Sequence, residues 1–336
     1  MFHMVDLVPV SGLDSEPAAA ARFDAWAEVQ GVAARHDLGD DHDAWTVDEL
    51  RGIMQDSTKH RSTVLAVHGH EVLGAGAVIA PLLDNQGVAS LVVTTRPDRR
   101  RAGVGGALLA WAEGHARELG RTTVVAQTQW AGGDVEDPHG PWARRRGFEP
   151  AQTVVRSDLA VDPSVPPRPP VAVPGYALET HCDAQPETDL EDRALLLRRI
   201  STDAPLGDLE LAEEEWDADR VRADDAKVAA MGRRVVATYA RHLESGRLVG
   251  YTVVQVPRAA PALAYQQDTL VLREHRGHGL GLALKLANHC ALAEEVPAVR
   301  TVRTWNAVEN THMLAVNTAL GFRPSGYTRE WQKHLH

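Results

Sequence analysis

Two glycine-rich segments have the residue types and the spacing needed to bind an anion. Arg100-Arg-Ala-Gly103-Val-Gly105 and Arg276-Gly-His-Gly279-Leu-Gly281 share the pattern R-x-x-G-x-G. Each follows an apolar run and precedes a segment of helical periodicity, so each lies where a strand turns into a helix. The first amides of such a helix have no internal partner, and glycine allows a ligand to approach the backbone closely. The pattern therefore predicts a turn that binds a pyrophosphate.

Two better-known phosphate motifs do not fit these turns. A dinucleotide site of the Rossmann type needs G-x-G-x-x-G after the first strand of its unit and an acidic residue about 20 positions later. A Walker A loop needs G-K-[ST], which neither turn contains. For one turn alone, glycines that serve only tight turning and close packing are an equally good interpretation. Two copies at equivalent places favour binding.

The spacing of two separate signals indicates a duplicated domain. The arginines that open the two turns, Arg100 and Arg276, are 176 residues apart, and the pairs Gly147-Phe148 and Gly321-Phe322 are 174 apart. Unrelated signals would not agree this closely, so a repeat of about 175 residues is expected.

The elements that must position the turns can be predicted in the same order in both halves. Hairpin signals occur at Gly69 and at Glu244–Arg247. In the first half we expect helices at about 17–32, 47–56 and 107–119 and strands at 63–67, 71–81 and 89–94. In the second half we expect helices at about 187–200, 213–231 and 280–292 and strands at 235–242, 248–256, 269–272 and 299–304.

A proline-rich segment at the midpoint separates the halves. Six prolines lie between Asp162 and Pro174, which excludes a helix and favours a stiff, extended linker. We therefore expect an N-terminal domain over 1–161, a linker over 162–173 and a C-terminal domain over 174–336. The fold class expected for each domain is α+β.

Composition excludes several classes of protein. The 336 residues are 44% hydrophobic and 24% charged, as in ordinary globular proteins, and the net charge of −11 argues against nucleic acid as a partner. Cys182 and Cys290 lie far apart, so neither a disulfide framework nor a cysteine zinc site is expected. No apolar run reaches 18 residues and the N-terminus does not resemble a signal peptide. We expect a cytoplasmic monomer or homodimer without a membrane partner.

The chain resembles the GNAT superfamily of acetyl-CoA-dependent N-acetyltransferases. The segment Val271–Gly281 is similar to the superfamily's pyrophosphate loop, and Asn310 through Gly321-Phe322 to its closing helix and following strand. The resemblance covers both halves, so it implies two tandem GNAT domains, each with a mixed, mostly antiparallel sheet flanked by helices. It also implies acetyl-CoA as co-substrate, transfer of an acetyl group to a primary amine of a small molecule by direct attack, and no metal.

The resemblance implies which residues hold CoA. Backbone amides of the second loop would bind the pyrophosphate with help from Arg276, the strand edge would pair with the pantetheine, and Asn310 would approach the pantetheine arm. The implied cofactor residues are Val271, Leu272, Arg276, Gly277, His278, Gly279, Leu280, Gly281, Asn310 and Asn317, and in the first half Arg101, Ala102, Gly103, Val104, Gly105 and Gly106.

The expected acid of the family is missing. Many GNAT members have a tyrosine four residues before the Gly-Phe pair, where this chain has Asn317 and Ala143. Tyr327, just after Gly321-Phe322, is a candidate substitute, and an aromatic packing role is the alternative.

A carboxylate next to the second loop is the candidate base. Asp268 precedes the buried run Thr269–Leu272 and would deprotonate the amine directly or through water, unless it only caps the strand. The first half has no carboxylate between Val88 and Thr95. We therefore expect the second half to be catalytic and the first to be degenerate or structural.

Trp305, Asn306 and Glu309 follow the next strand and are candidates for the acceptor site, with packing and helix capping as the alternative. The histidines His275, His278 and His289 have no carboxylate or cysteine at metal-ligand spacing.

An acidic run offers a guide to the acceptor. Eight carboxylates lie between Ser201 and Asp219, with no Lys or Arg before Arg220. They are either a solvated helix face or a field that attracts a cationic amine. An amino sugar and an amine-bearing antibiotic both remain open as acceptors, and a non-catalytic acetyl-CoA sensor or scaffold is the alternative function.

Overall fold

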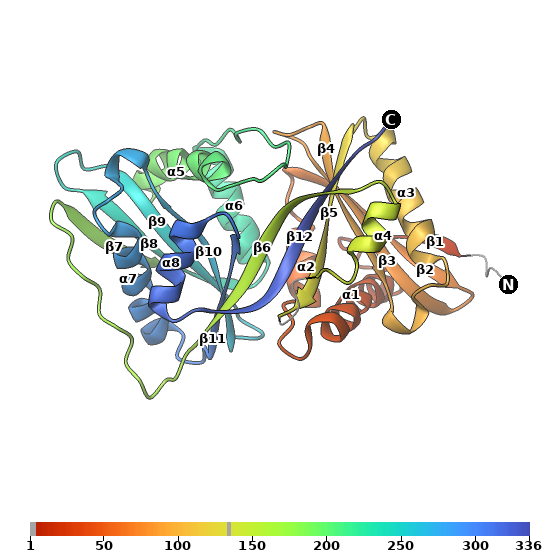
Figure 1. The fold of residues 1–336 in the computed structure, drawn as a ribbon, viewed down its shortest axis with the longest axis horizontal. Coiled ribbons are helices and arrows are strands. Elements are labelled where there is room, and N and C mark those ends of the chain that lie inside the picture. Colours follow the sequence, from red (N-terminus) through yellow and green to blue (C-terminus); the bar gives the residue numbers. More distant parts are fainter. Residues whose placement is uncertain (1–4, 133–135) are drawn as a thin grey trace. The chain divides into compact units, whose positions relative to one another are not determined.

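The computed structural model describes residues 5–132 and 136–336 (Figure 1). The chain forms two compact units, each with one mixed sheet and helices packed against it. Unit 1 consists of Met1–Thr153, Gly207–Leu211 and Gly326–His336, and unit 2 of Val154–Leu206 and Ala212–Ser325. The α+β class and the tandem arrangement expected from the sequence are confirmed.

Unit 1 has the strand order β1-β2-β3-β4-β5-β12, with only β4 and β5 parallel. Its strands are β1 (Asp6–Val10), β2 (Lys59–His68), β3 (Glu71–Pro81), β4 (Val88–Thr95), β5 (Thr123–Ala131) and most of β12 (Arg323–His334), and its helices are α1 (Pro17–Leu38), α2 (Val47–Ile53), η1 (Pro97–Arg99), α3 (Val104–Glu118) and α4 (Gly140–Arg145).

Unit 2 repeats this order as β7-β8-β9-β10-β11-β6, with only β10 and β11 parallel. Its strands are β7 (Tyr176–Cys182), β8 (Arg233–His242), β9 (Leu248–Pro257), β10 (Leu263–Val271), β11 (Thr301–Ala307) and most of β6 (Glu149–Ala160), and its helices are η2 (Glu187–Asp189), α5 (Leu190–Asp203), α6 (Ala218–Ala230), η3 (Arg273–His275), α7 (Leu280–Glu295) and α8 (Thr311–Leu320).

The last strand of each sequence half completes the other unit's sheet. In unit 2, β6 pairs with β11 from Thr301↔Ala160 to Ala307↔Val154, and in unit 1, β12 pairs with β5 from Gly326↔Ala131 to His334↔Thr123. Figure 1 shows yellow-green β6 beside β11 and blue β12 beside β5. The units therefore divide the chain within these two strands, and the proline-rich segment 162–173 lies inside unit 2.

Each loop helix packs on its sheet over a glycine. A Cβ at Gly250 on β9 would lie 2.9 Å from Leu270 O and 3.4 Å from Leu284 of α7, and a Cβ at Gly74 on β3 would lie 2.7 Å from Thr94 O and 3.0 Å from Leu108 of α3. Gly250 and Gly74 hold the same register position, since Gly250 pairs with Val271 and Gly74 with Thr95. The close approach brings both helix N-termini to the ends of β10 and β4.

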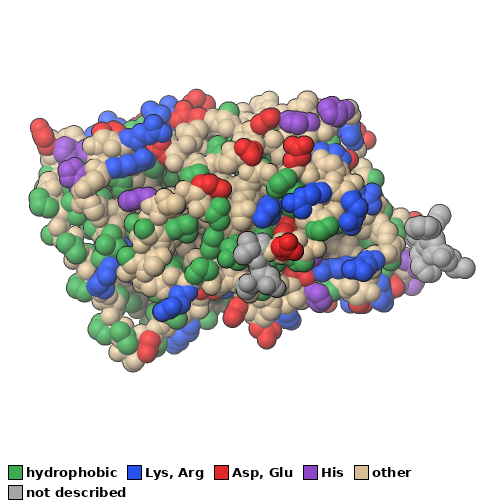
Figure 2. Space-filling view, in the orientation of Figure 1, with side chains coloured by type: hydrophobic (Ala, Val, Ile, Leu, Met, Phe, Trp, Pro, Cys, Tyr) green, Lys and Arg blue, Asp and Glu red, His purple; other side chains and the backbone are tan. Residues whose placement is uncertain are grey.

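No helix in the described parts of the chain is long and apolar enough to cross a membrane. Among the same residues, no three His, Cys, Asp or Glu side chains are grouped so as to hold a metal ion. Figure 2 shows acidic and basic side chains interspersed over the visible face.

Candidate functional site

The loop of unit 2 has an open backbone at the start of α7. Gly277 and Gly279 adopt left-handed φ angles of +85° and +78°, and added Cβ atoms at Gly277, Gly279 and Gly281 would meet nothing within 4 Å. Within the described chain, the amides of Gly277, His278 and Gly279 donate to no backbone carbonyl. These amides and the free first turn of α7 form a cradle that an anion can enter without displacing a side chain.

Asp203 at the end of α5 holds the arginines of this loop. Its Oδ1 accepts from Arg273 at 2.7 and 2.9 Å, and its Oδ2 accepts from Arg276 at 2.8 Å. Arg276 Nε also donates to Val271 O at 2.9 Å. These contacts hold Arg276 beside the cradle. The single negative charge of Asp203 offsets one of the two positive charges of Arg273 and Arg276. On the other side of the loop, the Tyr176 hydroxyl hydrogen-bonds with His275 Nδ1 at 2.9 Å, and its ring lies near His278.

The strands beside the loop part as they approach it. Parallel pairing of β10 with β11 covers only Leu263–Tyr265 against Thr301–Arg303. Beyond Tyr265 the edge of β10 that faced β11 is open, and it leads to Val271 and Leu272 at the loop. This open edge is where an extended chain with amide groups can pair.

Asp268 lies in a bulge of β10. The register against β9 shifts between Gln266 and Thr269, so β10 contains one residue more than its partner there. A bulge leaves the extra residue unpaired and redirects its side chain, and bulges are common beside active sites. Our prediction began this strand at Thr269, whereas it begins at Leu263, because the polar run Gln266-Gln267-Asp268 interrupts the apolar pattern.

The surroundings of Asp268 make it a suitable base. Desolvation, and then the charge of Asp224 on α6, raise the pKa of Asp268 to about 6, and the Tyr251 hydroxyl opposes this rise. Asp268 is nevertheless an exposed residue, so water reaches its carboxylate even though protein atoms surround it closely enough to raise its pKa. A carboxylate with a pKa near 6 is deprotonated at neutral pH and is a stronger base than an ordinary aspartate.

A tyrosine that no sequence pattern singled out, Tyr251, faces this carboxylate. Tyr251 on β9 pairs directly with Tyr239 on β8, and their rings stack at 6.4 Å. Tyr251 is 4% exposed, its hydroxyl interacts with Asp268, and among the described residues it has no hydrogen bond of standard geometry. Burial, and then the Asp268 charge, raise the pKa of Tyr251 well above its usual value. The hairpin turn at Glu244–Arg247 would have predicted the pairing of these tyrosines.

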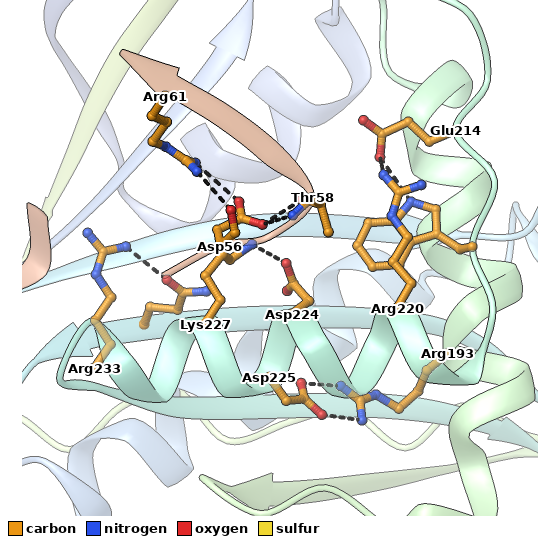
Figure 3. Close-up of polar contacts among 12 residues, drawn as sticks. Asp56, Thr58, Arg61, Arg193, Glu214, Arg220, Asp224, Asp225, Lys227 and Arg233 are labelled. Carbon is orange, nitrogen blue, oxygen red and sulfur yellow. Dashed lines mark hydrogen bonds and ion pairs between the residues drawn. The ribbon is translucent and has the colours of Figure 1, made fainter. Parts of the chain in front are cut away.

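Arginines neutralise much of the acidic run. Asp225 on α6 accepts two hydrogen bonds from Arg193 of α5, at 2.6 and 2.9 Å, and Lys227 donates to Asp224 (Figure 3). The carboxylates of the run that pair with arginine are Asp203, Glu213, Glu214, Glu215 and Asp219. Asp217 caps α6. The run is therefore largely a set of structural ion pairs, and the charge that reaches Asp268 comes from Asp224 and Glu214.

Of the remaining predicted residues of unit 2, Trp305 and Asn306 lie near the end of β11, and Glu309 and Asn310 follow this strand. Asn306 accepts a hydrogen bond from Asn317 Nδ2 at 2.6 Å, Trp305 lies against the Tyr265 ring, and Glu309 is exposed. Asn310 caps α8 by accepting a hydrogen bond from Met313 N at 3.2 Å.

Tyr327 belongs to unit 1, whereas Asp268 belongs to unit 2. On β12, Tyr327 pairs with Trp130 of β5, and the two rings stack at 5.5 Å. The structure therefore shows Tyr327 in the aromatic packing role that was the alternative to catalysis.

The matching loop of unit 1 is more crowded. Arg101 adopts a left-handed φ of +65° where unit 2 has Gly277, a conformation that costs a non-glycine residue free energy. A Cβ at Gly105 would lie 3.3 Å from Thr95, and one at Gly106 would lie 3.1 Å from Arg146. The other predicted loop residues, Ala102, Gly103 and Val104, lead into α3, with Gly103 at the left-handed N-cap.

The face of unit 1 that corresponds to Asp268 and Tyr251 is filled with apolar side chains. Strand β4 pairs with β3 without a bulge, and Val92 packs with Phe23 and Trp26 of α1. Trp26 Nε1 donates to Gly76 O at 3.0 Å, which fixes the indole on the sheet. This face of unit 1 contains an ordinary hydrophobic core.

The comparisons with solved structures agree with this architecture. A tandem GNAT protein from the clavulanic acid biosynthesis pathway matches with a TM-score of 0.83 and 28% identity over 99% of each chain. A GCN5-related N-acetyltransferase from Sphaerobacter thermophilus matches with a TM-score of 0.67 and 18% identity, over 98% of this chain and 96% of that one. Saccharomyces cerevisiae N-myristoyltransferase, solved with myristoyl-CoA, matches at 0.60 and 8% identity, over 98% and 78%.

Protein-family models and curated proteins give no match to the sequence. The fold and its solved relatives define the chain as a protein of the GNAT superfamily. It is a tandem GNAT protein, with one GNAT domain in each unit. The fold supports acetyl transfer in general.

Proposed function

We propose that unit 2 transfers an acetyl group from acetyl-CoA to a primary amine of a small cationic acceptor by direct attack. The observation that carries the proposal is Asp268, held in the β10 bulge beside the open strand edge and the buried Tyr251. With its raised pKa, Asp268 takes the proton of the acceptor amine, which then attacks the thioester carbonyl.

The loop residues of unit 2 support a site for CoA. The amides of Gly277, His278 and Gly279, with Leu280 and Gly281 of the first turn, would hold the pyrophosphate, and Arg276 would add positive charge. The open edge of β10 toward Val271 and Leu272 would pair with the pantetheine amides. Trp305 and Asn306 lie near the end of β11, on the other side of the gap, and Glu309 follows this strand; we expect all three to contact the acceptor.

Direct attack by the acceptor amine agrees with the state of the cysteines in the described part of the chain. Burial raises the pKa of both Cys182 and Cys290, so neither is an activated thiolate that would form an acyl-enzyme. A cationic acceptor suits Asp268 itself, and Asp224 and Glu214 still act on this carboxylate although Lys227 and an arginine pair with them.

For unit 1 we propose a structural or CoA-binding role through residues 101–106, without catalysis. A matched pair of variants tests this division. Gly279→Val would force a branched residue into a left-handed conformation and block the cradle of unit 2, and Gly103→Val makes the same change in unit 1. Acetyl-CoA consumption should be measured with a panel of cationic and neutral amines. We expect Gly279→Val to lose at least ~100-fold in kcat/KM and Gly103→Val to keep the wild-type value, a gap of at least about 3 kcal/mol.

Two other outcomes would decide against this proposal. CoA binding without turnover for any amine, in the wild type, would identify an acetyl-CoA sensor or scaffold. Equal rates for cationic and neutral amines, insensitive to ionic strength, would exclude a cationic acceptor while leaving acetyl transfer in place.

A further inference from the structure

Unit 2 contains a lysine in a position where lysine is costly. Lys285 lies in the second turn of α7 with only 1% of its surface exposed. Its Nζ donates to Asn317 Oδ1 of α8 at 2.8 Å and lies 5.7 Å from the centre of the Phe322 ring. Among the described residues it has no ion pair with a carboxylate, although buried lysines are almost always paired.

The charge state of Lys285 is sensitive to what binds beside it. Burial alone lowers the pKa of Lys285 to about 7. The neighbouring His289 stays neutral, because burial, and then the Lys285 charge, lower its pKa to about 3. A buried ammonium ion with neutral neighbours is a strong attractor for any anion that can reach it.

A hydrogen-bonded chain connects this amine to the gap between β10 and β11. Asn317 Nδ2 donates to Asn306 Oδ1 at 2.6 Å, and Asn306 is part-exposed on β11 beyond Arg303, where pairing with β10 has ended. Lys285 also lies only one and a half helical turns, roughly 8 Å, from the N-terminus of α7. An acyl-CoA arm that follows the open edge of β10 from that N-terminus would reach Asn306, which is hydrogen-bonded through the buried Asn317 to the buried Lys285.

We propose that Lys285, held by Asn317, is the binding site for the sulfur end of CoA and that its ammonium group stabilises the thiolate released by acyl transfer. The proposal rests on acyl transfer in unit 2. In that reaction the acceptor nitrogen forms a bond to the thioester carbon, the carbon–sulfur bond breaks and its electron pair stays on sulfur. Asp268 takes the proton from nitrogen, and the thiolate keeps its charge beside Lys285 until it is protonated from solvent.

The wild-type protein alone can test this. Bound CoA is titrated with pH by its thiolate absorbance, with bound desulfo-CoA as the blank. A thiol beside an ammonium ion should have a pKa roughly 1–3 units below the value of about 8.5 that is ordinary for a thiol. A bound thiol that titrates as it does in solution would overturn the proposal.

A matched pair of variants then assigns the shift. Lys285→Met removes the charge with little change in volume, and Leu109→Met makes the same kind of change at the equivalent position of α3 in unit 1. Lys285→Met should return the thiol pKa to the solution value and lower kcat by ~10–100-fold with little change in the KM for acetyl-CoA. Leu109→Met should change neither. A shift that survives Lys285→Met would exclude Lys285 as its source.

The failures of the two proposals are distinguishable. Absence of CoA binding, or of any effect of Gly279→Val on it, would remove both. Normal acetyl transfer with an unshifted thiol pKa would remove only the role of Lys285. If Lys285→Met does not fold, the titration of the wild type still decides.

Discussion

Lys285 and Asn317 of unit 2 occupy the positions of Leu109 and Ala143 in unit 1. Leu109 lies in α3 as Lys285 lies in α7, and Phe148 N donates to Ala143 O as Phe322 N donates to Asn317 O. On the other face of the sheet, the bulge with Asp268 replaces Val92 of the regular strand β4. Unit 2 thus has polar residues at positions where unit 1 has apolar ones.

Comparing these positions distinguishes residues that the fold requires from residues that a functional site would require. Unit 1 shows that the same backbone fold forms with leucine, alanine and valine at these positions, and its Leu109 and Ala143 belong to one hydrophobic cluster. Lys285 and Asn317 hydrogen-bond to each other, but burying an amine and an amide still costs more free energy than burying leucine and alanine. We propose that a ligand explains their presence, and the predictions below test that explanation.

The largest expected effect is the loss of the base. Asp268→Asn keeps the shape of the side chain but cannot accept the amine proton, so kcat/KM for acetylation should fall about 10²–10⁴-fold. The control is Val92→Ala, the equivalent position of unit 1, which should leave the rate unchanged. Near-wild-type turnover in Asp268→Asn would reduce this residue to a strand-capping role.

The pH dependence of the rate should report the same carboxylate. Asp268 acts as a base only when deprotonated, so kcat/KM should rise with pH up to about 6 and fall tenfold per pH unit below it. The Tyr251 hydroxyl lowers the pKa of Asp268, so Tyr251→Phe should move this inflection to higher pH. A pH–rate profile of the wild type and this variant checks both points, and an inflection that stays in place would separate Tyr251 from the base.

Converting the lysine site of unit 2 to that of unit 1 should stabilise the protein. Lys285→Leu with Asn317→Ala replaces a buried amine and its amide partner by the residues of unit 1, and replacements of buried charged groups by apolar ones stabilise by about 1–4 kcal/mol. Urea unfolding at pH 7 should show this gain together with a loss of activity. A less stable double variant would mean that the lysine serves the fold.

The sign of the pH effect follows from the lowered pKa of Lys285. Between about 7 and 10.5 the unfolded chain binds the lysine proton more fully than the folded one does, so the unfolding free energy of the wild type rises with pH. The advantage of the double variant should therefore be largest at and below pH 7 and shrink toward pH 10. A constant difference would show that Lys285 is not the cause.

Much of the fold was predictable because its signals are local. Glycine turns, the R-x-x-G-x-G spacing and the Gly-Phe pairs mark points where the backbone itself restricts the residue, so they survive in both units. The exchange of β6 and β12 was not predictable, because both strands have similar lengths and either could pair with β5 or β11. The choice is made by contacts far apart in sequence, and it moved Tyr327 into unit 1.

The candidate site was harder to predict than the fold. Asp268 was identified, but Tyr251 and Lys285 were not, because each fits its pattern of a strand or a helix and only burial makes it unusual. The bulge itself was visible as three polar residues in an apolar strand, and this signal was interpreted as the strand's beginning. Polar residues that interrupt a buried pattern are the clearest sequence sign of a site in this chain.

The smallest expected effect concerns the aspartates that hold the first arginine of each loop, Asp37 in unit 1 and Asp203 in unit 2. In unit 1, the two carboxylate oxygens of Asp37 accept hydrogen bonds from Arg100 at 2.8 and 2.7 Å, and in unit 2 Asp203 accepts one from Arg276. Burial opposes ionisation of Asp37, but hydrogen bonds from His139 and Arg100 hold its pKa well below the usual value. Asp37→Asn should therefore lower stability by about 1–3 kcal/mol without changing activity.

Asp203→Asn is the matched change, and it should raise the KM for acetyl-CoA a few-fold, because Arg276 then loses its place beside the cradle.

The pH dependence of stability follows from the lowered pKa of Asp37. Its contribution to the free energy of unfolding is complete above about pH 4 and is lost as the pH falls through the folded-state pKa, so the stabilities of the wild type and Asp37→Asn should converge only in acid. Thermal unfolding and acetyl-CoA kinetics of both variants check these outcomes. A KM change in Asp37→Asn equal to that in Asp203→Asn would mean that both loops take part in turnover, which would end the division between a working and a structural unit.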